Sequence, residues 1–420
     1  MTEPNRSGGP KRLRVAVRRF DPFETAIAEL FASWDPPHGA HVELDLVPLD
    51  VLDLHQQLLT DGGLTDGTFD VAFLVTDWLA QAIEEGHLLN LDSRVATSIP
   101  DHDTVWPASL RAFQQADDGI YGIPYHDGPE CLVYRRDLFE DEKNRAGFRR
   151  ETGRELEVPR TWDEYLEVAR WFSDPAGGQY GTVVVAYPDA HNTVYDFCLQ
   201  VWSRGGEITG ADGRPTLDTP QAQAGLDWYR ALVADPDLTH PDATQIDSVR
   251  SGEIFAAGDV AIMQNWFGFA ANAQVAPDSA VRGKVSVAPV PAGPGGSVTS
   301  FLVYWVLAIG AGCPQPDLAF DFVRHATSAD ADILTTLRGG IGCRRSTWTD
   351  PAVLEHIPFF DQMAELHAIA RTLPDDPKVA ALAEIIDDVV AQALATTTPS
   401  AELLAHAQVG ASALYEGRSA

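Results

Sequence analysis

Apolar residues follow two different periodicities along the first part of the chain. Short runs that are densely apolar or strictly alternating predict β-strands, at Leu13–Val17, Val42–Val47 and Phe69–Val75. Segments whose apolar residues recur three and four positions apart predict helices, at Pro22–Trp34, Leu52–Leu59 and Trp78–Glu85. Gly86 directly follows the third of these helices and suits a left-handed C-cap. This alternation predicts an α/β sheet with helices on both faces.

The same alternation returns in the second part of the chain and then gives way to helices alone. Helices are predicted at Thr161–Phe172, Thr193–Ser203 and Thr219–Val233, and strands at Gly181–Ala186, Gly258–Asn265 and Lys284–Pro289. Thr161 and Glu164 have the spacing of a capping box, and Thr219 precedes a proline at the first helical position. Two C-terminal helices are predicted at Val379–Ala395 and Ser400–Leu414.

Two of the predicted strands end in proline, which suggests where the chain passes between domains. These strands are Ile120–Pro124 and Val285–Pro291, and the glycines of Gly339–Arg345 permit a third passage. A chain of 420 residues is too long for one ordinary core. We therefore predict a two-lobed α/β fold, with lobe 1 formed by residues 10–125 and 290–338, and lobe 2 by residues 126–289 and 339–420. Three connections restrict the lobes to a hinge motion about a cleft.

Charge and cysteine content exclude several classes of function. A net charge of −31 argues against nucleic acid and against an anionic membrane surface as partners. The four cysteines form no Cys-x-x-Cys pair, so a zinc or redox motif is not expected. Free thiols are expected, and the sequence leaves a bridge between Cys313 and Cys343 open.

The N-terminal segment lacks the features of an export signal. Residues 1–10 are polar, and Lys11–Arg19 alternates charged with apolar residues. No apolar h-region follows, and no cysteine for lipid attachment lies nearby. We therefore expect no export signal in this chain as written, and its location stays open at this point.

Sequence motifs for catalysis, metal binding and cofactor binding are absent. The chain contains no Gly-x-Ser-x-Gly, no His-Glu-x-x-His, no phosphate-binding loop and no dinucleotide-binding glycine pattern. Its histidines have no ligand spacing. We expect neither a metal nor a cofactor, and we expect a protein that is not an enzyme.

The segment Asp117–Phe139 carries a family resemblance. Its sequence DGIYGIP…LVYRRDLF, together with Pro159–Tyr165 downstream, resembles the first interdomain crossing of the family 1 extracellular solute-binding proteins, which bind sugars for ABC transporters. The resemblance extends over nearly the whole chain from Arg14. It implies the type II periplasmic-binding-protein-like fold, a sugar or short oligosaccharide as ligand, delivery to ABC transporter permease subunits, and a monomer.

Residues at strand ends are the candidate ligand contacts, because ligands of open α/β sheets lie beyond the carboxyl ends of the strands. Sugar rings need aromatic planes for stacking and polar groups for their hydroxyls. The candidates are Phe20, Asp21, Asp77, Trp78, Tyr125, His126, Asp127, Tyr195, Asn265, Trp266, Tyr304 and Arg344. The resemblance favours the positions of Asp77, Trp78, Tyr195, Asn265 and Trp266, and the residues just after the Tyr-Gly-Ile-Pro crossing, Tyr125, His126 and Asp127. It also places Val303 and Tyr304 where many relatives carry two glycines.

Each candidate has a structural alternative. Trp78 and Tyr195 can pack inside their helices, Asp21 can cap the helix that follows it, and Arg344 can pair with an acid. Two other functions also stay open at this point: a hydrolase or lyase that uses the same cleft, and a cytoplasmic sugar sensor or carrier with the same fold.

Overall fold

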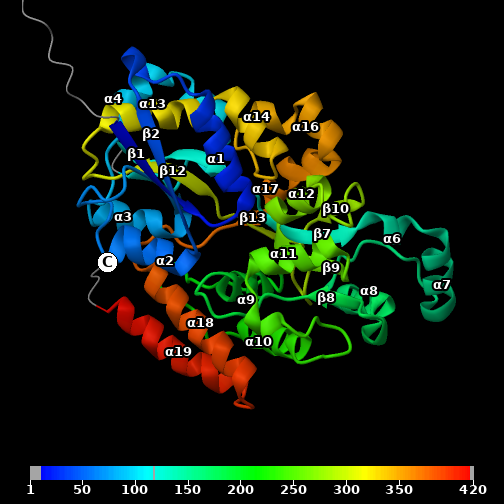
Figure 1. Cartoon of the computed structure of the whole chain (residues 1–420). Coiled ribbons are helices and arrows are strands. Elements are labelled where there is room, and N and C mark those ends of the chain that lie inside the picture. The colour runs from blue at the N-terminus through cyan, green and yellow to red at the C-terminus, as the bar shows by residue number, and fades with distance from the viewer. Residues whose placement is uncertain (1–10, 117–118, 417–420) are drawn as a thin grey trace, which may run out of the picture. The chain divides into compact units, whose positions relative to one another are not determined.

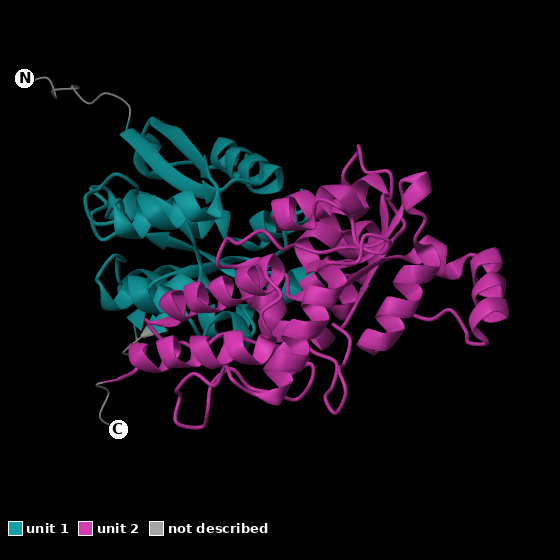
Figure 2. Cartoon of the chain, turned by 90° about the horizontal axis from the view of Figure 1, so that it is seen from below, with its two compact units in different colours: residues 1–127, 304–347 teal, residues 128–303, 348–420 magenta. Residues whose placement is uncertain are grey.

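The computed structural model describes residues 11–116 and 119–416. These residues form two compact units, which Figure 2 shows in different colours. Unit 1 contains residues 1–127 and 304–347, and unit 2 contains residues 128–303 and 348–420. The chain therefore passes from one unit to the other three times, after Asp127, after Val303 and after Thr347.

The second and third passages lie later in the chain than the residue pattern suggested. Strand β10 (Val285–Ala288) pairs antiparallel with β7 (Glu130–Arg135), and Val290 exchanges two backbone hydrogen bonds with Thr299. These bonds keep the segment expected to cross, Val285–Pro291, within unit 2. One strand that ends in proline therefore leads to a passage between the units, and the other stays within unit 2. The strand with which each one pairs distinguishes the two cases.

Unit 1 is built on one five-stranded sheet in the order β2-β1-β3-β12-β6. Its strands are β1 (Lys11–Arg18), β2 (Val42–Leu49), β3 (Val71–Val75), β6 (Ile123–His126) and β12 (Trp305–Ile309). The first three strands are mutually parallel, whereas β12 is antiparallel to both of its neighbours, β3 and β6. Every residue of β3 is buried, as expected for a strand with both faces covered.

Helices of unit 1 lie between and after these strands, and those near Pro22–Trp34, Leu52–Leu59 and Trp78–Glu85 were predicted from the sequence. The longer ones are α1 (Asp21–Ser33), α3 (Leu79–Glu84), α4 (Asp92–Ser98), α13 (Pro316–Ala326) and α14 (Ala329–Leu337) (Figure 1). The shorter pieces are η1 (Pro37–Gly39), α2 (Val51–His55), the π-turn η2 (Gln56–Thr60), η3 (Thr76–Trp78), α5 (His102–Val105), η4 (Ala108–Leu110) and α15 (Arg345–Trp348), whose last residue belongs to unit 2. The strands β4 (Gln115–Ala116) and β5 (Gly119–Ile120) form a separate two-stranded sheet.

Unit 2 is built on a six-stranded sheet whose central strand is β7. The order is β13-β11-β7-β9-β8, with β10 also paired to β7. The further strands are β8 (Tyr180–Val183), β9 (Val260–Trp266), β11 (Ser300–Phe301) and β13 (Ala370–Arg371). Strand β9 is antiparallel to β7 and parallel to β8.

The helices of unit 2 are α6 (Arg136–Glu140), α7 (Glu142–Thr152), α8 (Trp162–Phe172), α9 (Asn192–Trp202), α10 (Pro220–Val233), α11 (Ser248–Ala257), α12 (Phe267–Val275), α16 (Pro351–His356), α17 (Met363–Ile369), α18 (Val379–Ala395) and α19 (Ser400–Leu414), with single turns η5 (Pro175–Gly177), η6 (Ala243–Gln245) and η7 (Pro358–Gln362). Five of these helices, α8, α9, α10, α18 and α19, begin and end within one residue of the predicted bounds, and the other helices of the unit are not among those predicted from the sequence. The capping box of Thr161 and Glu164 is present, and the Thr219 side chain accepts from the Ala222 amide.

Helix α9 is the most deeply buried helix of unit 2. Its residues from Thr193 to Trp202 are all buried, so it lies inside the unit. The last two helices, α18 and α19, pack against one another, and α18 also contacts α9 (Figure 1). The long C-terminal helices therefore complete the core around α9.

The four cysteines are buried free thiols, two in each unit. Cys131 and Cys198 lie in unit 2, and Cys313 and Cys343 lie in unit 1. The bridge between Cys313 and Cys343 that the sequence left open is not formed, and the Cys313 thiol instead lies 3.2 Å from Asp70 Oδ1. Within the described ranges, no helix combines the length and the apolar character that a bilayer crossing requires.

The Thr161 cap of α8 gives a prediction about stability. Thr161→Ala removes the acceptor for the Glu164 amide, and we expect it to lower the free energy of unfolding by about 1 kcal/mol. Urea unfolding followed by circular dichroism measures this. Thr25→Ala, in the exposed middle of α1, is the matched control and should change stability by less than about 0.5 kcal/mol. Equal effects of the two substitutions would contradict the capping role.

Candidate functional site

The candidate residues are distributed over both units, and each group is described within its own unit. Unit 2 carries Tyr195, Asn265 and Trp266, and unit 1 carries the other nine. Strand polarity brings most of the unit 1 group to one edge of its sheet. Because β12 is antiparallel to both β3 and β6, the carboxyl ends of β1, β3 and β6 and the start of β12 all lie at that edge.

Three candidates in unit 1 follow directly from strand ends and retain partly exposed positions. Phe20 and Asp21 follow β1; Phe20 is partly exposed and packs on Phe23 at 5.1 Å between ring centroids. Asp21 is exposed in the first turn of α1. Phe20 is the N-cap residue and Asp21 is already the first helical residue, so Asp21 is not the cap. Asp77 is partly exposed in the turn after β3.

Trp78 lies in the same turn and is only 3% exposed. Its ring packs edge to face with two others, the His55 ring at 5.1 Å and the Trp305 ring at 6.2 Å. Trp305 is the first residue of β12 and is partly exposed. Trp305 is not among the twelve candidates predicted from the sequence, although its place beside Tyr304 at the start of a strand was a usable signal.

Tyr125 and His126 are buried in unit 1 and hydrogen-bonded to its own residues. The Tyr125 hydroxyl lies 3.3 Å from Thr335 Oγ1. His126 Nδ1 accepts the Ile341 amide at 2.9 Å, and the Asp127 amide donates to the Ile341 carbonyl at 3.0 Å. Burial lowers the pKa of His126 to about 3, so its ring is neutral in this environment. These bonds fasten the end of β6 to the loop after α14.

The loop after α14 is held by one buried carboxylate. Asp332 accepts the amides of Cys343 and Arg344 at 2.9 and 3.0 Å and the Thr347 hydroxyl at 2.6 Å. Arg344 itself donates from Nε to the Thr327 carbonyl at 2.7 Å, and its guanidinium lies 4.8 Å from the Trp106 ring centroid. These contacts keep residues 339–347 within unit 1, which explains why the third passage comes after Thr347.

Tyr304 and Asn265 are buried and have polar atoms bonded within their own units. The Tyr304 hydroxyl donates to Gln114 Oε1 at 2.6 Å. The Asn265 amide donates to the Ser248 carbonyl at 3.1 Å and to Ser251 Oγ at 2.7 Å, and its oxygen accepts the Trp266 amide at 2.7 Å. Asn265 therefore fixes the end of β9 and the start of α11 relative to one another.

Tyr195 and Trp266 belong to a group of aromatic rings in unit 2. The Tyr195 ring is perpendicular to the Trp266 ring at 5.4 Å, and it lies 4.7 Å from the Phe301 ring. The Trp202 ring lies 5.2 Å from the Phe301 ring. Trp266 is partly exposed, and its indole N–H donates to Asn192 Oδ1 at 3.3 Å. We call Tyr195, Trp202, Trp266 and Phe301 the unit 2 aromatic cluster.

Buried acids next to this cluster were not predicted. Glu130 begins β7 and Asp196 follows Tyr195 in α9, and they are 3% and 7% exposed. The available signal was a glutamate directly before the apolar run Cys131–Val133 of a strand. Among the described residues, no cluster of histidine, cysteine and carboxylate side chains suits a metal ion.

Comparison with known proteins places this fold in a family. The family model for bacterial extracellular solute-binding proteins matches residues 41–333, which is more than half of the chain. The chain belongs to this family. The family comprises binding proteins, which agrees with the two sheets, the helical connections and the discontinuous units described above.

Individual relatives agree with this membership. A Deinococcus radiodurans protein named "Probable ABC transporter-binding protein" is 26% identical over 358 residues, covering 81% of this chain and 78% of the relative. The lactose-binding protein of Rhizobium radiobacter is 24% identical over 375 residues, covering 87% and 83%. A solute-binding protein of Agrobacterium radiobacter K84, solved in complex with ribitol, superposes with a TM-score of 0.84 at 25% identity, covering 97% of this chain and all of that one.

The buried His126 gives a prediction about pH. Its folded pKa lies below the ordinary value of about 6.5, so the unfolded chain binds a proton first as the pH falls. This residue's stabilising contribution is therefore lost as the pH falls from about 6.5 toward 3, by up to about 1.4 kcal/mol for each pH unit. His126→Asn keeps an acceptor for the Ile341 amide and cannot titrate. We expect the variant to lose less stability than the wild type between pH 6.5 and 4.5 in urea unfolding.

His38→Asn is the matched control for this measurement. His38 is exposed and has a positive φ of 60°, which asparagine tolerates well. Parallel stability curves for the wild type and His126→Asn would refute the buried neutral ring.

Proposed function

We propose that this protein binds a sugar or short oligosaccharide between its two units, closes on it by a hinge motion, and delivers it as a monomer to the permease of an ABC transporter. The protein binds its ligand without converting it. The observation that carries the proposal is the unit 2 aromatic cluster at the end of β9, in a chain that belongs to the solute-binding family.

Aromatic rings beside polar side chains match the chemistry of a sugar. A pyranose ring offers apolar C–H faces and a rim of hydroxyls, so it needs a stacking plane with hydrogen-bonding groups around it. In unit 2, Trp266 is the partly exposed ring and Tyr195 and Phe301 support it from within. In unit 1, Phe20, Asp21, Asp77 and Trp78 lie at one sheet edge, where carboxylates accept hydroxyl hydrogens strongly.

The remaining candidates have different roles in this proposal. Asp127 and Arg344 contribute polar groups from unit 1. Tyr125, His126, Tyr304 and Asn265 act as supports, because their polar atoms already bond within their own units.

The hinge motion is proposed from the way the chain enters and leaves each unit. The first two connecting segments are attached to unit 1 at His126 and at Trp305, which are paired with one another in its sheet. In unit 2 the same segments are anchored at Glu130 and Phe301, which are also paired. Two short connections anchored side by side at both ends allow bending and resist twisting. A ligand then shifts the population toward the closed form by binding that form more tightly.

The ligand class is supported by what related proteins bind. The lactose-binding relative and the ribitol complex concern a disaccharide and a sugar alcohol. Both ligands carry many hydroxyl groups on an apolar carbon frame, which is the chemistry that the aromatic rings and carboxylates fit.

A ligand screen tests this function. Thermal unfolding of the full chain is measured with a panel of monosaccharides, sugar alcohols and oligosaccharides, and at least one is expected to raise Tm, because a ligand that binds the folded state stabilises it. Small-angle scattering should then show a smaller radius of gyration with that ligand, and chromatography should recover the ligand unchanged. A panel without any Tm shift would refute the sugar assignment, and a chemically altered ligand would refute binding without conversion.

Substitutions in each unit test the contacts. Trp266→Ala and Asp21→Ala should each weaken the affinity measured by calorimetry roughly ten- to hundredfold, or about 1.4 to 2.8 kcal/mol. Their matched controls are Trp171→Ala, on the outer side of α8 against Phe148, and Glu43→Ala, exposed on β2. Unchanged affinity in both site variants, with Tm preserved, would exclude these residues as contacts.

A further inference from the structure

A pair of buried carboxyl groups lies directly behind the unit 2 aromatic cluster. Glu130 is the first residue of β7, Asp196 lies in α9, and Gln264 lies in β9 between them. The Gln264 amide nitrogen donates to Glu130 Oε1 at 2.8 Å and also to Asp196 Oδ1. Because both carboxyl groups accept from the same nitrogen atom, their oxygens lie close to one another. The Gln264 amide nitrogen therefore donates one hydrogen bond to each of the two carboxyl groups.

No positive charge compensates these acids. Neither Glu130 nor Asp196 takes part in an ion pair with an arginine, lysine or histidine in the described part of the chain. The titratable groups that interact with the pair from the surrounding elements are neutral: Tyr165 on α8, Tyr229 on α10 and Cys131 on β7.

The two tyrosines do not cancel the negative charge. The Tyr229 hydroxyl donates to the Val185 carbonyl at 2.6 Å and also faces Asp196, and the Tyr165 hydroxyl is bonded to Thr182 Oγ1 at 2.5 Å. Both hydroxyls are neutral, so neither compensates a carboxylate charge. Two carboxylates that share one buried site cannot both be ionised without a large cost. The pair therefore holds one proton, so that only one of its two carboxyl groups is ionised. Burial raises the pKa of Glu130 to about 7 and raises that of Asp196, in agreement with this geometry.

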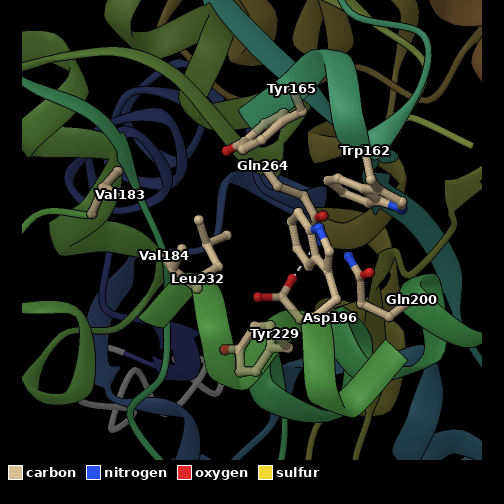
Figure 3. A pocket seen from close by; sticks show the side chains of 10 residues that line it. Trp162, Tyr165, Val183, Val184, Asp196, Gln200, Tyr229, Leu232 and Gln264 are labelled. Carbon is tan, nitrogen blue, oxygen red and sulfur yellow. Dashed lines mark hydrogen bonds between the residues drawn. The ribbon is translucent and has the colours of Figure 1, made fainter. Parts of the chain in front are cut away.

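Solvent has little room to relieve the charge. Asp196 and Gln264 line a cavity of about 10 Å³, together with Trp162, Tyr165, Val183, Val184, Gln200, Trp228, Tyr229 and Leu232 (Figure 3). That volume accommodates about one water molecule. A second negative charge at the pair would therefore be poorly hydrated and would push its elements apart.

The pair and Gln264 join β7 to α9 and β9, which carry three of the four rings of the aromatic cluster, and β7 also pairs with β11, which carries the fourth. Glu130 is paired in the sheet with Trp266 on one side and Phe301 on the other. Gln264 precedes Trp266 by two residues and therefore projects from the same face of the sheet. Asp196 is adjacent to Tyr195 in α9. A change in the spacing of β7, β9 and α9 thus changes the mutual positions of the Tyr195 and Trp266 rings.

We propose that Glu130, Asp196 and Gln264 are positioning residues that hold Tyr195 and Trp266 in their binding arrangement through one proton shared by the two carboxyl groups. This inference rests on the proposed function for the ligand, but the proton and its effect on the rings exist without one. Loss of the proton as the pH rises separates β7, β9 and α9 and weakens binding. Affinity is therefore highest at mildly acidic pH.

The first experiment needs no ligand. The full chain is labelled with 5-fluorotryptophan, and the Trp266 resonance is assigned by its loss in Trp266→Phe. We expect this fluorine resonance to shift between pH 5.5 and 8.5 in the wild type. It should stay constant in Glu130→Gln, whose amide keeps the hydrogen bonding but cannot ionise. Asp196→Asn serves the same purpose if Glu130→Gln does not fold, and Glu402→Gln, exposed on α19, is the matched control that should behave as the wild type.

The second experiment measures affinity for ribitol and lactose over the same pH range. Wild-type affinity should fall roughly five- to tenfold as the pH rises, and the affinity of Glu130→Gln should change less than twofold. If neither compound binds but the Trp266 resonance still shifts with pH, ribitol and lactose are not the ligands of this protein, and the inference of a shared proton still holds. A Trp266 resonance that is constant in the wild type, or that titrates equally in Glu130→Gln, overturns the inference.

Discussion

The position of strand β12 determines how the rest of this chain is organised. β12 lies between β3 and β6 and is antiparallel to both, so the sheet of unit 1 is incomplete without it. The chain reaches β12 only after the whole of residues 128–303, which belong to unit 2. Unit 1 can therefore finish folding only after that insertion has been made, and such long-range pairing is slow compared with local contacts. The same arrangement anchors the first two connections on neighbouring strands.

In unit 2, the strand β7 has the corresponding central role. It pairs with β9, β10 and β11, and its first residue is a glutamate buried among aromatic rings. An apolar residue there would avoid the cost of a buried acid. Asp196 and Gln264 make the acid tolerable by sharing hydrogen bonds with it. The structure thus keeps a polar network where simple packing would serve stability better, next to the rings proposed to contact the ligand.

Local signals predicted much of the fold because they depend on neighbouring residues alone. The Thr161 capping box, the Thr219 cap and the helix Val379–Ala395 all lie where the sequence indicated. The passage expected at Val285–Pro291 lies elsewhere, because pairing of β10 with β7 joins residues far apart in sequence. Gly258 was taken as the start of a strand, but it ends α11 with a φ of 90°, and β9 begins at Val260.

The candidate site likewise contains positions that local sequence could predict and contacts that it could not. Strand polarity was enough to predict that Phe20, Asp77 and Asp127 follow the ends of strands at one sheet edge. It could not reveal that His126 bonds to Ile341, because that partner lies more than two hundred residues away in sequence. The pair of Glu130 and Asp196 was missed for the same reason: Glu130 stands directly before an apolar run, but the residues that meet it in the fold lie far away in sequence.

The distribution of cysteines provides a built-in reporter. Each unit contains two thiols that are hidden from solvent and free of bridges. A thiol reagent can therefore modify a given pair only when the unit around it opens. Mass spectrometry of the modified peptides would time the opening of each half separately, in the native sequence and without any introduced label.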